Sequence, residues 1–463
     1  MRPRQPSRSK PIAEVVSMAS SGRIRAFPLL LLIILIAIGG GVFMLFRDRT
    51  APVTELSPLT VYVSKNMQLT AHAEDAKSGI RSMAVQVTAG DKTWDIASAQ
   101  FPDKPASANL AFSLKDLPLK DGDIVIDVFA VDGSYAKFGG GNMAHLSRTH
   151  TLDTQPPRIA ITSGVINITR GGAGAVSYSV DEEPAMTGVR AGDYFFPAYK
   201  QANGNWSALF AFPYTMDVQD YQPVLMATDA AGNEAAVNLS VNARPREFRD
   251  DTINLPQSFL DRKMPEFAQA FPDKKNNLDI FLAVNSIMRK NNRQALLEMG
   301  QHSRPTPLWH GAFLRMPGAT MAQFADHRSY IYNGEKVDEQ THLGFDLAST
   351  QRADVPAAND GVVAYTGNMG IYGNCVVIDH GMGLMTLYAH MSEIAVSTGD
   401  EVTKGQSLGK TGSTGMAGGD HLHFGVLVSG LPVMPVEWWD AHWIQDNLSE
   451  KIPDVMGTTA NGS

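Results

Sequence analysis

The chain has 463 residues, of which 44% are hydrophobic, and a formal net charge of -8. This length exceeds one ordinary domain core, so about three globular units are expected. The negative charge argues against a protein that coats nucleic acid, because such a protein needs a basic face to displace counterions from phosphates. A single cysteine, Cys375, excludes an intrachain disulfide, a zinc ribbon and a cysteine-rich metal cluster.

The N-terminal segment predicts a membrane anchor. Residues 26–46 form an apolar stretch without a charged side chain. As a helix, this stretch is long enough to cross roughly 30 Å of hydrocarbon. The preceding head, 1–25, is strongly basic, so the positive-inside rule places it in the cytoplasm and exports the rest of the chain. A cleaved signal peptide is the alternative, but no A-x-A cleavage site follows the apolar run. We therefore expect a single-pass protein of the cytoplasmic membrane, with its N-terminus inside.

The next two hundred residues predict β-sandwiches. Short stretches of alternating apolar and polar residues, separated by Gly, Asp, Asn and Pro, are typical of such folds. The segments IDVFAVDGS and VLMATDAAGNEAAVNLSVN resemble each other, which indicates an internal repeat. We expect Ig-like modules at 51–154 and 155–244, with their boundary at the prolines of 153–157. They would act as spacers or binding arms.

A change of periodicity marks the following segment. Apolar residues recur at spacings of three and four within 259–271 and 278–299, which predicts a helical linker over 245–305. From 306 to 446 the sequence becomes Gly-rich and β-rich again, and 447–463 is expected to form a tail. The fold class is therefore mainly β: two Ig-like β-sandwich modules, a helical linker, and a C-terminal antiparallel β domain.

Two segments of the C-terminal domain carry candidate metal ligands. In HLGFDLA, His342 and Asp346 share one parity of an alternating pattern, so a strand would point both to one side. A helix would also align them, but Gly344 between them favours the strand. In HLHFGVLV, His421 and His423 alternate with apolar residues in the same way. Two imidazoles and a carboxylate could thus converge on one ion.

Such a set suits catalytic zinc. Three nitrogen and oxygen ligands leave the fourth tetrahedral position open for water. The motifs H-x-x-x-D and H-x-H each occur often by chance, so neither is informative alone. Their combination on two strands, followed by Gly-rich turns, is more specific.

Three segments in this order, HLGFDLA, LYAHMS and GDHLHFGV, resemble the signature motifs of lysostaphin-like, LytM-type peptidases. The resemblance spans roughly 311–436. It implies that His342, Asp346 and His423 bind Zn²⁺, and that His390 and His421 are catalytic histidines that do not bind the metal. It further implies a zinc metalloendopeptidase that hydrolyses the peptide cross-links of bacterial peptidoglycan, at Gly-Gly bridges or at D-Ala to diaminopimelate bonds.

Other interpretations remain beside this one. Some relatives have lost ligands and act as non-catalytic regulators of another wall hydrolase, although all five positions are filled here. A biotinyl- or lipoyl-type carrier would explain TGDEVTKGQSLG but not the paired histidines. The resemblance leaves room for a protein activator, which the sequence does not identify.

Several further residues have ordinary explanations. We interpret His380 as structural, because it lies at a turn, and Cys375 as a small buried hydrophobe. Asp326 and Arg328 could shape a groove or form a surface ion pair. Trp438 and Trp439 are expected to cover a core edge.

Overall fold

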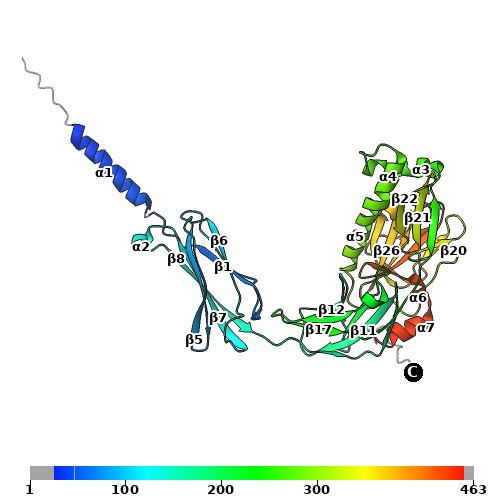
Figure 1. Ribbon diagram of the computed structural model, residues 1–463, viewed down its shortest axis with the longest axis horizontal. Coiled ribbons are helices and arrows are strands. Elements are labelled where there is room, and N and C mark those ends of the chain that lie inside the picture. Colours follow the sequence, from blue (N-terminus) through cyan, green and yellow to red (C-terminus); the bar gives the residue numbers. More distant parts are fainter. Residues whose placement is uncertain (1–25, 46, 453–463) are drawn as a thin grey trace, which may run out of the picture. The chain divides into compact units, whose positions relative to one another are not determined.

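The computed structural model describes residues 26–45 and 47–452, and this part of the chain is mainly β, as predicted (Figure 1). The described residues fall into two compact units: those up to Val61 together with Lys65–Thr151, and Tyr62–Ser64 together with those from Leu152 onward. The predicted cytoplasmic head at 1–25 and the part of the predicted tail from 453 onward lie outside the described residues.

Helix α1 occupies Ala26–Leu45, inside the stretch predicted to span a membrane. Among the residues that the structure describes, no helix is both long enough and apolar enough to cross a membrane. The predicted transmembrane helix is therefore not confirmed.

Two sheets build the first unit. One has the order β1-β3-β6, and the other contains β8-β7-β4-β5 in this order. Alternate side chains of β3 and β7 are buried, and β3 contacts β4 while β1 contacts β7, so the sheets enclose a core between them. The Ig-like assignment itself stays a prediction. The elements are β1 (Val53–Ser57), β3 (Leu69–Glu74), β4 (Ile80–Ala89), β5 (Lys92–Gln100), β6 (Ser107–Phe112), β7 (Gly122–Asp132), α2 (Ala136–Gly139) and β8 (Met143–Leu152), while β2 (Tyr62–Val63) is assigned to the second unit.

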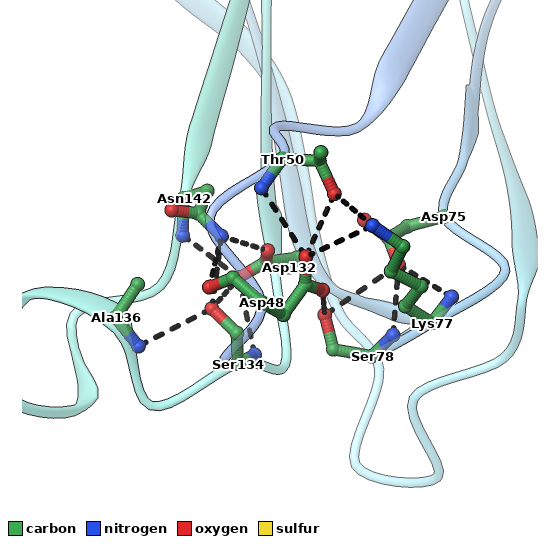
Figure 2. A network of polar contacts seen from close by, with 9 residues as sticks. All are labelled: Asp48, Thr50, Asp75, Lys77, Ser78, Asp132, Ser134, Ala136 and Asn142. Carbon is green, nitrogen blue, oxygen red and sulfur yellow. Dashed lines mark hydrogen bonds and ion pairs between the residues drawn. The ribbon is translucent and has the colours of Figure 1, made fainter. Parts of the chain in front are cut away.

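A polar network fixes the loops at one end of this unit (Figure 2). Asp132 Oδ1 accepts hydrogen bonds from the backbone N–H groups of Ser134, at 3.1 Å, and Asn142, at 2.8 Å. The Asn142 amide donates to Asp132 Oδ2, at 2.7 Å, and to the backbone carbonyl of Asp48, at 3.3 Å. One asparagine thus joins the end of β7 to the start of the module.

The second unit repeats this clamp. Asp229 Oδ1 accepts from the backbone N–H of Asn233 at 2.8 Å, and the Asn233 amide donates to Asp229 Oδ2 at 2.9 Å and to the carbonyl of Asp153 at 3.0 Å. These bonds match those of Asp132 and Asn142 in kind and direction. The internal repeat predicted from the sequence therefore corresponds to a repeated hydrogen-bond arrangement between an Asp and an Asn. In the first copy, an insertion separates these two residues.

The first part of the second unit is again built from short strands. Two four-stranded antiparallel sheets have the orders β14-β15-β11-β9 and β13-β12-β16-β17, and β10 pairs with β18 in parallel. The elements are β9 (Ile159–Ile161), β10 (Ile166–Thr169), β11 (Ala173–Val180), β12 (Met186–Ala191), β13 (Tyr194–Pro197), β14 (Tyr199–Lys200), β15 (Trp206–Ala211), η1 (Val218–Asp220), β16 (Val224–Thr228), β17 (Glu234–Asn238) and β18 (Val241–Arg244).

The segment predicted as a helical linker is helical only in part. Its helices are α3 (Gln257–Lys263), η2 (Met264–Ala270), α4 (Asn277–Ala283), η3 (Val284–Met288) and α5 (Arg289–Gly300). They are preceded by a strand, β19 (Asp250–Asn254), which pairs in parallel with β21 (His327–Tyr332) of the C-terminal domain. The prediction of a helical linker over 245–305 was wrong at Asp250–Asn254, because pairing with a distant strand decides the structure of so short a segment.

The C-terminal domain is organised around a large antiparallel sheet of order β20-β23-β31-β27-β26-β25-β29, with β32 beside β31. Smaller sheets have the orders β19-β21-β22 and β24-β30-β28. The remaining elements are β20 (Ala319–Ala322), β22 (Glu335–Thr341), β23 (Phe345–Ala348), β24 (Asp354–Pro356), β25 (Gly361–Asn368), η4 (Gly370–Tyr372), β26 (Asn374–Gly381), β27 (Leu384–Ala389), β28 (Glu393–Ile394), β29 (Glu401–Val402), β30 (Ser407–Lys410), β31 (Leu422–Val428), β32 (Leu431–Val433), α6 (Pro435–Trp439), α7 (Ala441–Ile444) and η5 (Gln445–Ser449).

Both faces of this sheet are covered. On β31, Leu422, Phe424, Val426 and Val428 join one apolar cluster, while Leu427 joins another that contains side chains of α3, α4 and α5. The helical segment therefore packs against the sheet, in agreement with the neighbouring positions of α4, α5 and β26 in Figure 1. It forms part of the domain.

The start of the predicted tail is also part of the core. Leu448 and Ile452 are fully buried in the cluster that contains Trp438. The Ser177 hydroxyl on β11 donates to the backbone carbonyl of Lys451 at 2.5 Å. The boundary expected at 447 was therefore placed too early, because two apolar side chains in a polar sequence gave little sign of burial.

Candidate metal centre

Strand pairing brings together the three predicted metal ligands. Asp346 on β23 lies directly opposite His423 on β31 in the antiparallel register. Side chains of directly opposite residues project from the same face and lie about 5 Å apart at their Cβ atoms. His342 lies between β22 and β23, before a bend at Gly344, and was wrongly predicted to lie within the strand. Its Nε2 atom nevertheless lies within 3.0 Å of both Asp346 and His423.

The potential ligand atoms lie within hydrogen-bonding distance of one another. His342 Nε2 is 2.9 Å from Asp346 Oδ1 and 3.0 Å from His423 Nδ1, and His423 Nδ1 is 2.9 Å from Asp346 Oδ1. All three residues are buried. Donors of a tetrahedral zinc ion lie about 3.3 Å apart, as follows from metal–ligand distances near 2.0–2.1 Å. The three donors thus need to separate by only a few tenths of an ångström to hold one ion.

The surroundings of His342 select the nitrogen that faces this centre. Its Nδ1 lies 2.8 Å from the backbone carbonyl of Gln323, which can only accept, so Nδ1 carries the hydrogen. The lone pair is then on Nε2, directed at Asp346 and His423. A backbone acceptor behind a ligating imidazole is the usual arrangement in metal sites, because it fixes the tautomer and the ring orientation. The donor set therefore fits a divalent cation such as zinc.

The electrostatics favour the forms that bind metal. Burial would raise the pKa of Asp346, but the neighbouring His342, His421 and His423 hold it well below its ordinary value. Burial lowers the pKa of His423 to about 4, against the opposing effect of Asp346. A carboxylate and a neutral imidazole are the forms in which these groups coordinate a metal.

The two predicted catalytic histidines lie beside this set. The rings of His390 and His421 are 4.9 Å apart, centre to centre, and His390 is 5.8 Å from the ring of His423. His421 Nε2 lies 3.6 Å from Asp346 Oδ1, farther than the mutual distances of the three donors. The structure thus places all five predicted residues together and leaves His390 and His421 outside the close three-atom group.

Their surroundings differ. His390 Nδ1 bonds the carbonyl of Thr414 at 2.8 Å, and His421 Nδ1 bonds the carbonyl of Gly419 at 2.9 Å, so each Nε2 is free of a backbone hydrogen bond. Burial, with His421 and His423 adding to it, holds the pKa of His390 well below its ordinary value. Burial also acts to lower the pKa of His421, but the hydrogen bond and charge of Asp346 outweigh it and raise the value.

Residues from outside the predicted motifs complete the cleft. A cavity of about 130 Å³ is lined by the five site residues together with Arg289, Arg328, Tyr372 and neighbouring groups. An adjoining groove of about 410 Å³ shares Arg289 and Arg328 and extends along Ile253–Phe259. Arg289 and Tyr372 could not be predicted from the sequence as cleft residues, because their place in the cleft depends on how the helical segment packs.

The residues given ordinary explanations stay outside the centre, with one exception. His380 is buried and bonds the Asp360 carbonyl and the Thr386 hydroxyl, which is a structural role. Burial raises the pKa of Cys375 to about 12, so its thiol stays protonated. The exception is Arg328, whose nearest recorded carboxylate is Asp346 at 3.5 Å and not Asp326. Asp326 instead accepts from the backbone N–H of Gln323.

Two carboxylate groups elsewhere also bring their oxygens within 4.8 Å of one another: Asp48 with Asp75 and Asp132, and Asp153 with Glu182 and Asp229. Neither contains a histidine. Of these three groups of possible ligands in the described part of the chain, the one around Asp346 alone combines imidazole and carboxylate donors.

Comparison with known proteins agrees with this geometry. Residues 340–435 match the model of Peptidase family M23. The chain is 44% identical over 95 residues to the DD-carboxypeptidase/endopeptidase Mpg of Neisseria meningitidis, covering 20% of this chain and 22% of that protein. It is 45% identical over 92 residues to the peptidoglycan DD-endopeptidase ShyA of Vibrio cholerae, covering 20% of this chain and 21% of that protein.

A solved structure of a peptidase M23 from Pseudomonas aeruginosa has 20% identity and a TM-score of 0.37, with 59% of this chain and 95% of that chain covered. The match to the curated relatives thus spans about a fifth of their length. The match to the M23 family, at 340–435, contains all five site residues. Residues 340–435 are therefore similar to M23 peptidases.

Proposed function

We propose that this protein is a zinc-dependent endopeptidase that hydrolyses the peptide cross-links of bacterial peptidoglycan. The observation that carries the proposal is the convergence of His342 Nε2, Asp346 Oδ1 and His423 Nδ1 within 3.0 Å, inside the segment that matches M23 peptidases. Relatives that share this segment are named peptidoglycan DD-endopeptidases, which supports wall peptides as the substrate.

These three atoms would hold the zinc ion. When bound, zinc supplies Lewis-acid polarisation of the scissile carbonyl and activation of water. The three donors are buried and line the cavity in which the scissile bond would lie. Since the three side chains are used in binding, proton transfer must come from other groups.

His421 and His390 are placed for that task. Each directs Nδ1–H at a backbone carbonyl, so each Nε2 can accept a proton or a hydrogen bond. His421, whose pKa Asp346 raises, would take the proton of the attacking water and deliver it to the leaving amine. His390, which burial keeps neutral, would orient the attacking water by accepting a hydrogen bond from it at Nε2.

We further propose that the bond cut is of the D-Ala to diaminopimelate type, as the names of the relatives suggest. Peptidoglycan lies outside the cytoplasmic membrane, so the catalytic domain would work there. The basic head and apolar stretch at the N-terminus support that location through their sequence alone.

The test is digestion of purified peptidoglycan by the full chain, with released fragments identified by mass and zinc measured on the same sample. We expect cross-linked fragments to be converted to monomers, and a strong chelator to abolish the conversion until zinc is restored. Wall peptides left intact by zinc-loaded protein would contradict the proposal. Stimulation of a separate wall hydrolase by that inactive protein would support the non-catalytic regulator instead.

A further inference from the structure

Two arginines from different elements reach the cleft beside the metal centre. Arg289 is the first residue of α5, and Arg328 lies on β21. Both line the cavity that contains the five site residues, and both line the adjoining groove. A ligand bound at the metal centre would therefore meet both guanidinium groups.

Neither arginine has a carboxylate partner that remains available when metal is bound. Arg289 donates through Nε and Nη2 to the side-chain oxygen of Asn285, at 3.2 and 2.6 Å, and this amide is neutral. Within the described part of the chain no ion pair of Arg289 is recorded. Arg328 approaches only Asp346, at 3.5 Å, and its buried Nε has no hydrogen-bond partner.

The cleft is consequently short of negative charge. Asp346 is one of the proposed zinc ligands, so its charge would be shared with the cation. Arg293 adds a further positive charge near Arg289. A half-buried guanidinium without an anion is unfavourable, because it loses hydration without gaining a partner. Asn285 is itself held by Asp338 at 2.6 Å, so Arg289 is fixed in position before any ligand arrives.

We propose that Arg289 and Arg328 bind a carboxylate of the substrate, namely the free α-carboxylate of the residue that supplies the nitrogen of the scissile bond. This inference rests on the proposed function and specifies its substrate. In a D-Ala to diaminopimelate cross-link that carboxylate is two bonds from the scissile nitrogen, so it must occupy the metal cleft. A terminal D-Ala–D-Ala bond presents the same group, whereas a Gly-Gly bridge presents a neutral amide there.

Guanidinium groups suit this role because their planar N–H donors match the two oxygens of a carboxylate. The proposed site would therefore select bonds followed by a free carboxylate and disfavour bonds within a continuous peptide. Cleavage itself redistributes no charge at the arginines: the amide bond breaks, water supplies the hydroxyl and the proton, and the carboxylate leaves with the amine product.

The test compares two synthetic cross-link peptides that differ only in this group, a free carboxylate in one and a carboxamide in the other. We expect full-chain protein to cleave the carboxylate peptide at least about 10-fold faster, measured as kcat/KM. Arg289→Gln and Arg328→Gln should each lower that rate by about 10- to 100-fold, from the loss of a charge-assisted hydrogen bond. The rate on the carboxamide peptide should change little, so the preference should collapse.

The matched control is Arg190→Gln on β12, an exposed arginine outside the cleft, which should keep the wild-type preference. Zinc content is measured for every variant, because Arg328 touches a proposed ligand. Equal cleavage of both peptides by the wild type, or an equal loss on both peptides in the variants, would overturn the carboxylate site and leave the endopeptidase intact.

A second measurement needs no turnover. Calorimetric binding of the free-carboxylate and carboxamide products to chelator-treated protein should favour the carboxylate, and Arg289→Gln should remove the difference. If the protein cleaves no wall peptide but still shows this preference, the proposed function fails and the carboxylate site stands. Equal binding of the two products would overturn the site.

Discussion

Glu437→Gln is expected to stabilise the protein in alkaline solution. Glu437 lies on α6, is 9% exposed, and accepts a hydrogen bond from the backbone N–H of Ala173 at 3.0 Å. Burial raises the pKa of its carboxyl to about 8, from an ordinary value of 4.5, although Ala173 and Arg246 act in the opposite direction. The folded protein therefore holds this proton more tightly than the unfolded chain does.

The sign and size of the effect follow from that difference. A group whose folded pKa is raised contributes stability that is fully present below about 4.5 and is lost as the pH rises through about 8. The complete loss is on the order of 4–5 kcal/mol, of which roughly 2–3 kcal/mol falls between pH 6 and pH 9. Gln cannot ionise and still offers Ala173 an oxygen, so the variant should keep the stability that the wild type loses.

Denaturant unfolding followed by tryptophan fluorescence at pH 6 and pH 9 would measure this, because the adjacent Trp438 is fully buried. Glu450→Gln, at an exposed position nearby, is the control and should follow the wild type at both pH values. Parallel pH profiles for wild type and Glu437→Gln would show that Glu437 is already ionised in the folded protein, against the reasoning from its burial.

The remaining predictions concern the metal centre. His423→Ala should lose zinc, whereas His421→Ala should keep it and lose activity on the order of 10²–10⁴-fold, as should His390→Ala; zinc loss in all three variants alike would contradict the division of roles. Gly344→Ala should weaken zinc binding, because an added Cβ would lie 2.5 Å from His423 Nε2; an unchanged zinc affinity would mean that the ring can shift freely. Gly300→Ala should lower the unfolding midpoint, since its Cβ would meet the backbone of Gly430 at 2.1 Å, and a wild-type midpoint would refute that packing argument.

The metal centre could be foreseen from the sequence because its signal is local. Alternation along 342–348 and 421–428 predicts which side chains share a face, and the structure places Asp346 opposite His423 accordingly. The alternating pattern could not predict the pairing register of Asp346 and His423, which are 77 residues apart in the sequence. It also could not predict that β23 begins after His342. The resemblance to LytM-type peptidases indicated that the five residues belong to one site, which the local patterns alone did not establish.

The covering of the sheet could not be foreseen. One polar and one apolar face were expected for β31, yet the strand is buried throughout, because the helical segment packs on the face that carries His423 and Leu427. The periodicity of 278–299 predicted those helices. It contained no information about which surface they would meet.

The proposed catalytic residues and the proposed carboxylate-binding arginines come from different segments of the chain. All five proposed metal and catalytic residues lie within 340–435, the segment that matches M23 peptidases, whereas Arg289 and Arg328 lie before it. Arg289 reaches the cleft only because α5 packs against the sheet, and Gly300 at the end of that helix fits directly against Gly430 of the β31–β32 turn. The segment that resembles M23 peptidases would thus provide the catalytic residues, and the helical segment packed on it would determine which bond is cut. Proteins with the same five residues but a different covering segment should therefore differ in the bond they cut.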